Sequence, residues 1–189
     1  MEEKFIDVFS AGDFRRWLEK NHDKEKRIGL VLHKKHTGKP SASHRELMNE
    51  AICFGWIDTT LRPLDNDKFI RFFNRRNKNS KWSENTLSYA KQLIKDGKMT
   101  PHGLKFYHEG RKKKAFDHGI PKNPDMIPEL EKALSKNKKA KENFSNLTKT
   151  VRRVYLRWIL MAKQEKTRER RIKKVIARML EKDWRILRF

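Results

Sequence analysis

Residues 53–85 constrain the fold of this chain more than any other stretch. Within it, two runs rich in apolar and β-branched residues, 56–62 and 69–73, flank a Pro-Leu-Asp-Asn-Asp turn. Such runs around a turn of this composition predict an antiparallel β-hairpin. The short apolar run at residues 27–34 predicts a further buried strand. A sheet of three strands is stable when one of its faces packs on helices, so helices are expected to cover this one.

Capping residues predict where those helices begin. Ser43 opens a Ser-x-x-Glu capping box, and Ser83 is the expected N-cap of a later helix. A helix is also expected over residues 11–21, capped by Gly12 or Asp13, because its apolar residues recur at helical spacing. Helices are therefore expected both before and after the hairpin.

The expected secondary structure changes from mixed strands and helices to helices alone after residues 110–128, a segment that has three prolines and a basic run. Beyond it every apolar pattern has helical spacing, and two of the helices are expected to begin at Thr150 and Thr167. We therefore expect an α+β fold in which a small antiparallel sheet is covered by helices and followed by a C-terminal helical unit. The expected domains are residues 1–118 and 119–189.

The charge of the chain is strongly positive and uneven. It carries 47 Lys and Arg against 24 Asp and Glu, a formal net charge of +23. Residues 111–189 hold 25 basic and 9 acidic residues, a surplus of 16. Such a surplus attracts polyanions such as nucleic acid, although a solvated basic surface would have the same composition. With 5 Trp and 11 Phe the chain is too aromatic to be disordered.

Metal, redox and membrane chemistry find little support in the sequence. Cys53 is the only cysteine, which excludes a disulfide framework and a thiolate zinc site. His33 and His36 would point to opposite faces of a strand, so neither a metal nor a cofactor is expected. No apolar run approaches the ~20 residues of a membrane helix, and the N-terminal residues do not resemble a signal peptide. The expected location is the cytoplasm.

A candidate ligand site lies within residues 53–85. Arginines alternate there with aromatic residues just before a hydroxyl-rich helix start. A helix N-terminus near an arginine can hold a phosphate or carboxylate, and a tryptophan offers a stacking face. The alternative is that Ser83 only caps the helix and the tryptophans fill the core. The candidate pocket residues are Trp56, Asp58, Arg75, Arg76, Ser80, Trp82, Ser83 and Asn85.

A second candidate surface is the basic amphipathic hairpin expected from the last two helices. Two helices joined by a short turn, the second of them basic, could lie against nucleic-acid phosphates. The outer faces of an ordinary helical bundle would show the same pattern. The candidate residues are Arg152, Arg153, Lys163, Arg168, Arg170, Arg171 and Lys174.

Several motifs together resemble a known family. They are Gly55-Trp56-Ile57-Asp58, the run from Arg75 to Asn85, Gly97-Lys98-Met99-Thr100-Pro101-x-Gly103, and Thr150-x-Arg152-Arg153-x-Tyr155-x-x-Trp158-Ile159. This combination resembles the YdeI/OmpD-associated family, also called bacteriocin-protection proteins, with an OmdA-type region at the C-terminus. The resemblance implies an accessory protein connected with stress survival, and it supplies no catalytic residues.

The residues and the resemblance together favour a non-enzymatic binding or stress-protection protein that accepts an anionic ligand. Two alternatives remain. One is a nucleic-acid-binding module that uses the basic C-terminal hairpin. The other is an enzyme acting on a small acidic or phosphorylated substrate in the candidate pocket. A protein partner is also compatible with the resemblance.

Overall fold

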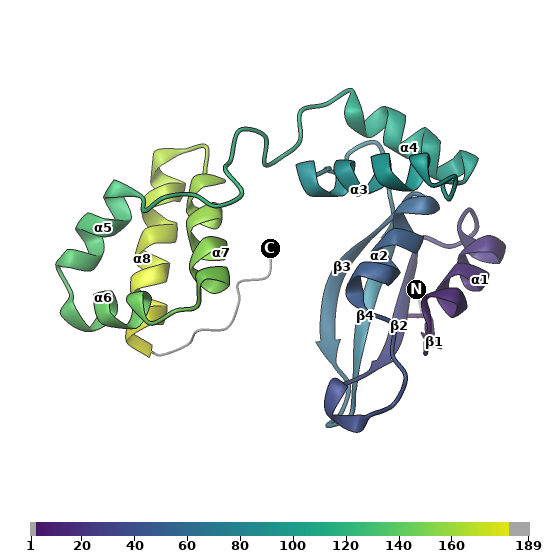
Figure 1. The fold of residues 1–189 in the computed structure, drawn as a ribbon, viewed down its shortest axis with the longest axis horizontal. Coiled ribbons are helices and arrows are strands. Elements are labelled where there is room, and N and C mark those ends of the chain that lie inside the picture. The colour runs from purple at the N-terminus through teal and green to yellow at the C-terminus, as the bar shows by residue number, and fades with distance from the viewer. Residues whose placement is uncertain (1–2, 182–189) are drawn as a thin grey trace. The chain divides into compact units, whose positions relative to one another are not determined.

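The computed structural model describes residues 3–181, and the chain divides into two compact units, Met1–Phe116 and Asp117–Phe189. Unit 1 contains a four-stranded sheet with helices, and unit 2 is helical (Figure 1). Over the described residues the chain forms eight α-helices and four strands, which confirms the predicted α+β class.

The sheet has the strand order β1-β2-β4-β3. Its strands are β1 (Phe5–Asp7), β2 (Arg27–His33), β3 (Trp56–Pro63) and β4 (Lys68–Arg75). The predicted hairpin is confirmed, since β3 pairs antiparallel with β4, and β4 pairs antiparallel with β2. Strand β1 was not predicted because it has only three residues. It pairs parallel to β2, so the sheet is mixed rather than purely antiparallel.

Unit 1 contains four helices: α1 (Ala11–Asn21), α2 (His44–Cys53), α3 (Glu84–Lys95) and α4 (Pro101–Arg111). The core joins Ile28, Leu30 and Leu32, which alternate along β2, with apolar residues from all four helices. Alternate residues of a strand share one face, so α1 and α2 pack against the face of the sheet that carries these three residues, and α3 and α4 pack on α2.

The capping of α1 and α2 shows how their starting points are fixed. Ser43 forms the predicted capping box with Glu46. For α1 the predicted cap was wrong, because Ser10 takes that position and accepts from the backbone N–H of Asp13. The Asp13 carboxylate in turn accepts from the Ser10 N–H at 2.8 Å. Asp13 is therefore the third helical residue of a second capping box rather than the cap itself.

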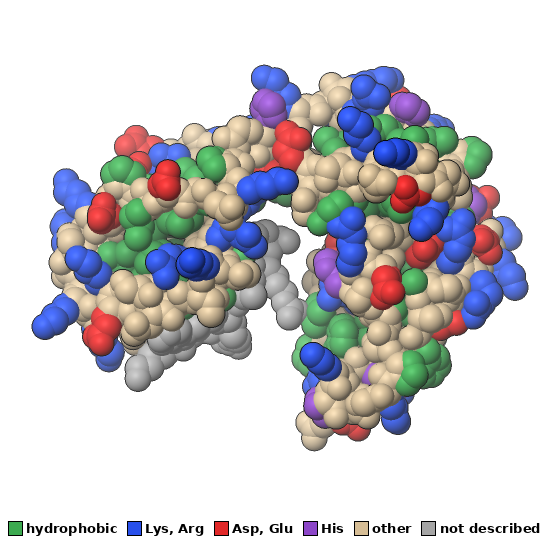
Figure 2. All heavy atoms as spheres, in the orientation of Figure 1, with side chains coloured by type: hydrophobic (Ala, Val, Ile, Leu, Met, Phe, Trp, Pro, Cys, Tyr) green, Lys and Arg blue, Asp and Glu red, His purple; other side chains and the backbone are tan. Residues whose placement is uncertain are grey.

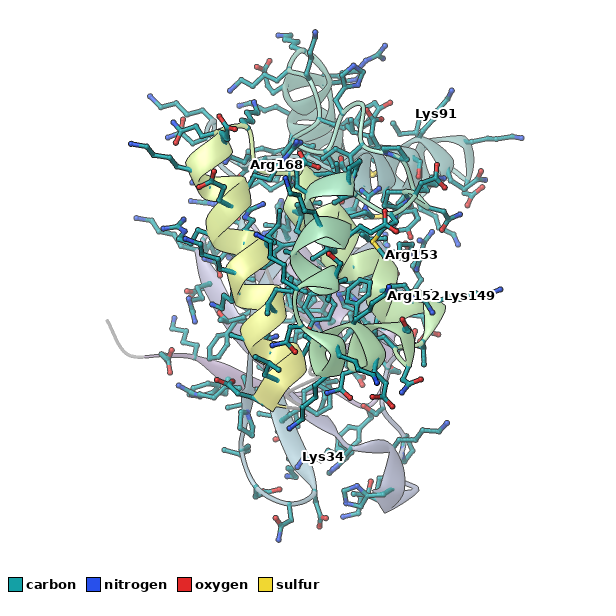
Figure 3. The ribbon with its side chains drawn as sticks, turned by 90° about the vertical axis from the view of Figure 1, so that its left-hand side faces the viewer. Lys34, Lys91, Lys149, Arg152, Arg153 and Arg168 are labelled. Carbon is teal, nitrogen blue, oxygen red and sulfur yellow. The ribbon has the colours of Figure 1, made fainter. Side chains whose placement is uncertain are left out.

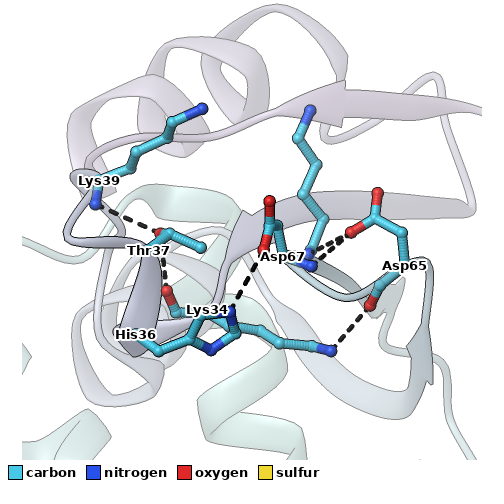
Figure 4. Close-up of polar contacts among 7 residues, drawn as sticks. Lys34, His36, Thr37, Lys39, Asp65 and Asp67 are labelled. Carbon is cyan, nitrogen blue, oxygen red and sulfur yellow. Dashed lines mark hydrogen bonds and ion pairs between the residues drawn. The ribbon is translucent and has the colours of Figure 1, made fainter.

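A polar network joins the segment after β2 to the β3–β4 turn, at the end of the sheet where β2 ends (Figure 4). Lys34 Nζ donates to the carbonyl of Asp65 at 2.7 Å. His36 Nε2 lies 3.2 Å from Asp67 Oδ1. Asp65 Oδ1 accepts from the backbone N–H of Asp67 at 2.7 Å, which tightens the turn. These contacts hold the hairpin turn against the residues that follow β2.

Unit 2 consists of α5 (Pro128–Ser135), α6 (Lys138–Ser145), α7 (Lys149–Leu160) and α8 (Glu165–Glu181). Its core includes Phe144, Tyr155, Ile159 and Val175. Helices α7 and α8 both begin earlier in the chain than predicted. The cap of α7 is Thr148 rather than Thr150, and α8 begins at Glu165, which leaves Thr167 inside the helix. Among the described residues, no helix combines the length and apolarity needed to cross a membrane.

Candidate functional site

Trp56 lies in the core of unit 1. It is 0% exposed, and its indole N–H donates to the carbonyl of His22 at 3.2 Å. Its ring meets the Trp17 ring edge to face at 5.5 Å between centroids. With its ring enclosed in this way, Trp56 offers no free stacking face.

Asp58 lies at the centre of a small polar cluster on β3. His44 Nε2 is 2.9 Å from Asp58 Oδ2, and Arg71 Nη1 donates to the same oxygen at 3.4 Å. Burial raises the pKa of Asp58, but the hydrogen bond from His44 and the charge of Arg71 outweigh burial and hold this pKa below its ordinary value. Asp58 is therefore a paired carboxylate at neutral pH.

Sequence reasoning missed His44 and Arg71 as partners of Asp58. Arg71 could have been found from the strand register, because Asp58 pairs with Phe73 and residues two apart on a strand share a face. His44 could not, since the packing of α2 beside β3 is a tertiary contact.

Arg75 and Ser80 are engaged within the protein. The guanidinium of Arg75 donates to the carbonyl of Asp23. Ser80 Oγ accepts from the backbone N–H of Asn77 at 2.9 Å. Each of the two side chains is thus hydrogen-bonded to a backbone group of the protein.

Ser83 and Asn85 also have partners at the start of α3. Ser83 is the N-cap, and its Oγ accepts from the backbone N–H of Thr86 at 3.0 Å. Asn85 Nδ2 donates to the hydroxyl of Tyr89 at 2.7 Å. The capping function expected for Ser83 is confirmed.

Arg76 and Trp82 are the two candidate pocket residues that the structure brings into direct contact. The Arg76 guanidinium carbon lies 3.7 Å from the centroid of the Trp82 ring. Arg76 is only 2% exposed, and its Nη1 donates to the carbonyl of Lys81 at 3.1 Å. Its Nε and Nη2 atoms are buried and have no hydrogen-bond partner. Burial lowers the pKa of Arg76 to about 9, against an opposing effect of the Asp58 carboxylate.

Trp82 is fixed in place by α4. It is 5% exposed, and its ring meets the ring of Tyr107 edge to face at 6.3 Å. A Cβ atom added at Gly110 would lie 2.2 Å from Trp82 Nε1, so the indole rests directly on the helix backbone. The face against which Arg76 stacks is therefore held rigidly.

In unit 2, two of the candidate arginines stabilise backbone or loop groups. Arg152 Nη2 donates to the carbonyl of Leu147 at 3.1 Å, just beyond the end of α6. Arg153 Nη1 donates to Asn123 Oδ1 at 3.4 Å. Figure 3 shows both residues on α7, with Lys149 near Arg152. Because these guanidinium groups have internal partners, they are less available to an external phosphate.

Two arginines of α8 are also engaged. Arg168 Nη1 lies 3.1 Å from Glu129 Oε1, an ion pair between α8 and α5. Arg171 donates to the carbonyl of Trp158, and its guanidinium carbon lies 5.1 Å from the centroid of that ring. Both residues tie α8 to its neighbours in the helical unit.

One face of α8 is exposed and basic. Its residues are Lys166, Arg170, Lys173 and Lys174, all exposed and spaced so that they share one side of the helix. We call this set the α8 basic face. Lys166 and Lys173 extend the candidate set, since they share this side of the helix with Arg170 and Lys174. Glu169 flanks the face, and Lys163 is exposed just before the helix.

Two surface hollows lie away from the Arg76–Trp82 contact. One, of about 580 Å³, is bordered by Lys4, Lys26, Arg27 and Phe72. The other, of about 500 Å³, is in unit 2 and is bordered by Lys163, Arg168 and Glu129 among others. In the described part of the chain, no three His, Cys, Asp or Glu side chains are grouped so that they could hold a metal ion.

Comparison with known proteins gives two family matches. Residues 6–106 match the model of a domain of unknown function, DUF8412. Residues 123–182 match the model described as Bacteriocin-protection, YdeI or OmpD-Associated, which confirms the expected resemblance over this region. No match was found among curated proteins or among solved structures.

Proposed function

Since the chain belongs to the DUF8412 family of unknown function and carries a YdeI/OmpD-associated segment at residues 123–182, we propose that it is a non-enzymatic accessory protein that binds the phosphates of nucleic acid. The proposal places the protein in the cytoplasm, where nucleic acid is accessible. A contribution to stress or bacteriocin survival, in keeping with the description of the C-terminal model, would then act through nucleic acid.

The α8 basic face is the observation that carries this proposal. From Lys166 to Lys174 the helix advances about 12 Å at 1.5 Å per residue. A duplex presents about seven phosphate charges over that length. Four exposed cations on one side of a straight element can therefore meet several phosphates at once.

The arginines that have partners inside the protein also support the proposal, because they leave the binding of phosphates to the α8 basic face. Arg152, Arg168 and Arg171 bind carbonyl or carboxylate groups of the protein itself. Unit 2 can keep these internal contacts while α8 presents the basic face outward. Binding would then need no rearrangement of the helical unit, and it would read the backbone rather than the sequence of the nucleic acid.

A charge-matched pair of variants tests the proposal. The first replaces Lys166, Arg170, Lys173 and Lys174 with Gln. The control replaces four exposed lysines of unit 1 with Gln: Lys91, Lys95, Lys98 and Lys105. Both variants lose four positive charges, so a difference between them reports location and not net charge. Fluorescence anisotropy with a random-sequence duplex, at a series of salt concentrations, measures affinity and its salt dependence.

The parent protein is expected to bind with an affinity that falls steeply with salt. Each phosphate contact contributes about 0.9 to the log–log slope. With four contacts removed, the α8 variant should therefore lose about 3.6 units of slope and at least tenfold in affinity at low salt. The unit 1 control should stay within about twofold of the parent. Equal losses in both variants, or no binding by the parent, would overturn the proposal, and circular dichroism would establish that both variants are folded.

A further inference from the structure

Arg76 occupies an unusual position for a charged residue. It directly follows β4, and its backbone N–H donates to the carbonyl of Gly55 at 2.9 Å. Its side chain is folded inward beneath the Trp82 ring, which leaves the residue 2% exposed. Arginine is rarely buried to this extent unless it is paired.

The hydrogen bonding of Arg76 is incomplete in a specific way. A guanidinium has five N–H donors in a fixed planar fork. The Nη1 group donates to the Lys81 carbonyl, whereas Nε and Nη2 have no partner. Nε and Nη2 form the edge of the guanidinium that donates two parallel hydrogen bonds to the oxygens of a carboxylate or phosphate. The whole of that edge is unsatisfied.

The carboxylate of Asp58 does not satisfy Nε and Nη2 of Arg76. Asp58 influences Arg76 electrostatically, but its carboxylate is bound by His44 and Arg71. A buried charge that is not hydrogen-bonded to an opposite charge is costly. An arginine retained in that state is therefore explained best by a partner that comes from outside the chain.

We propose that Arg76 is the receptor for a small oxyanion, held by parallel hydrogen bonds from Nε and Nη2 and covered by the Trp82 ring. The chemistry is that of a carboxylate or phosphate group. This site belongs to unit 1 and is independent of the α8 basic face.

Access to the site needs a local movement. Nε and Nη2 are out of contact with solvent, so an anion reaches them only if the segment that covers them opens. Trp82 is fixed on α4, so the part that opens is the loop at residues 77–81, whose Lys81 carbonyl accepts from Arg76 Nη1.

The Nε–H resonance of Arg76 reports directly on the proposed bonds. Inorganic phosphate and acetate are titrated separately into the full-length protein, with sodium chloride holding the ionic strength constant. The expected result is a saturable change in the Arg76 Nε–H signal and a rise in melting temperature with at least one of the two anions. A response to phosphate alone identifies a phosphate-bearing ligand, and a response to acetate alone identifies a carboxylate.

Three variants test whether the response to anions depends on the guanidinium group of Arg76, on its positive charge alone, or on any arginine in this part of the chain. Arg76→Met removes the charge at similar volume, and Arg76→Lys keeps the charge but removes the fork. Arg75→Met changes the neighbouring arginine, which donates to Asp23 instead. The anion-dependent rise in melting temperature should disappear in both Arg76 variants and persist in Arg75→Met. In sodium chloride without phosphate or acetate, Arg76→Met should melt above the parent, because a buried charge without an opposite charge beside it is gone.

The proposal fails if the Arg76 Nε–H signal responds to neither anion and the melting temperature follows ionic strength alone. It also fails if Arg76→Lys keeps the full anion response, since a point charge would then suffice. Should Arg76→Met not fold, Arg76→Lys and the parent spectra still decide the question.

Discussion

At the scale of single residues, Asp58 links stability to pH in a predictable direction. Its pKa is held below the ordinary value by His44 and Arg71, despite burial. A carboxylate of this kind stabilises the fold above its unfolded pKa, near 3.8, and loses that contribution as pH falls through the folded pKa. Asp58→Asn should therefore lower the free energy of unfolding by about 1–2 kcal/mol at pH 7. As pH falls below 3.8 the difference from the parent should narrow, so it should be smaller at pH 3 than at pH 7.

Urea denaturation of parent and variant at both pH values provides the measurement. The exposed Asp125 serves as the control position, since Asp125→Asn changes the same net charge without touching the cluster. If the gap between parent and Asp58→Asn were as large at pH 3 as at pH 7, the Asp58 charge would not be its source.

The candidate pocket shows how far residue-level prediction reaches. Proximity along the chain was enough to place Arg76 and Trp82 in one group, and capping rules were enough for Ser83. Whether a side chain is free, however, depends on partners such as the His22 carbonyl for Trp56 or the Asp23 carbonyl for Arg75. Those carbonyls lie more than thirty residues away in the chain, and no local pattern identifies them.

At the scale of elements, Gly103 fixes the contact between α4 and α2. A Cβ atom there would lie 2.1 Å from the carbonyl oxygen of Cys53. Intrinsic helix propensity favours Ala over Gly by about 1 kcal/mol. The clash is with backbone atoms, which cannot move aside as a flexible side chain would. Gly103→Ala should therefore destabilise the protein by about 2–3 kcal/mol, the opposite of what propensity alone predicts.

Gly12→Ala is the matched control because it lies in another helix, α1, where an added Cβ meets its nearest neighbours at ordinary distances, 3.5 Å and 3.6 Å. That change should be neutral or slightly stabilising. Guanidinium unfolding followed by circular dichroism measures both. An equal effect of the two substitutions would show that helix propensity, and not the contact with Cys53, decides the outcome.

Helices and strands with strong local patterns were predictable, and those that depend on distant contacts were not. The β3–β4 hairpin and the Ser43 capping box follow from residues adjacent in sequence. Strand β1 forms because the β2 edge is available for parallel pairing, which its own three residues cannot indicate. The start of α7 was misplaced because Thr148 and Thr150 are equally good caps by residue type, and only the structure shows that Thr148 Oγ1 accepts from Val151 N–H.

At the scale of the whole molecule, the net charge of +23 opposes the compact state through self-repulsion. Lys and Arg side chains are spread over the visible surface of both units, with fewer acidic groups among them (Figure 2). Salt screens this repulsion, since the Debye length falls from about 30 Å at 0.01 M to about 8 Å at 0.15 M. Salt also weakens attractive pairs such as Arg15–Glu50 and Arg157–Asp117. Such pairs are short-range and partly buried, so screening affects them less than it affects the long-range repulsion.

The melting temperature should consequently rise when sodium chloride is increased from 0.01 M to 0.3 M. A gain of about 1 kcal/mol corresponds to about 2–4 °C for a chain of this size. The variant with Gln at the four positions of the α8 basic face has less repulsion to screen, so its melting temperature should rise less. In Arg76→Met the melting temperature should rise with sodium chloride nearly as much as in the parent, because one buried charge adds little to the repulsion between surface charges. A melting temperature that falls with salt would show instead that attractive pairs dominate the electrostatic free energy of the fold.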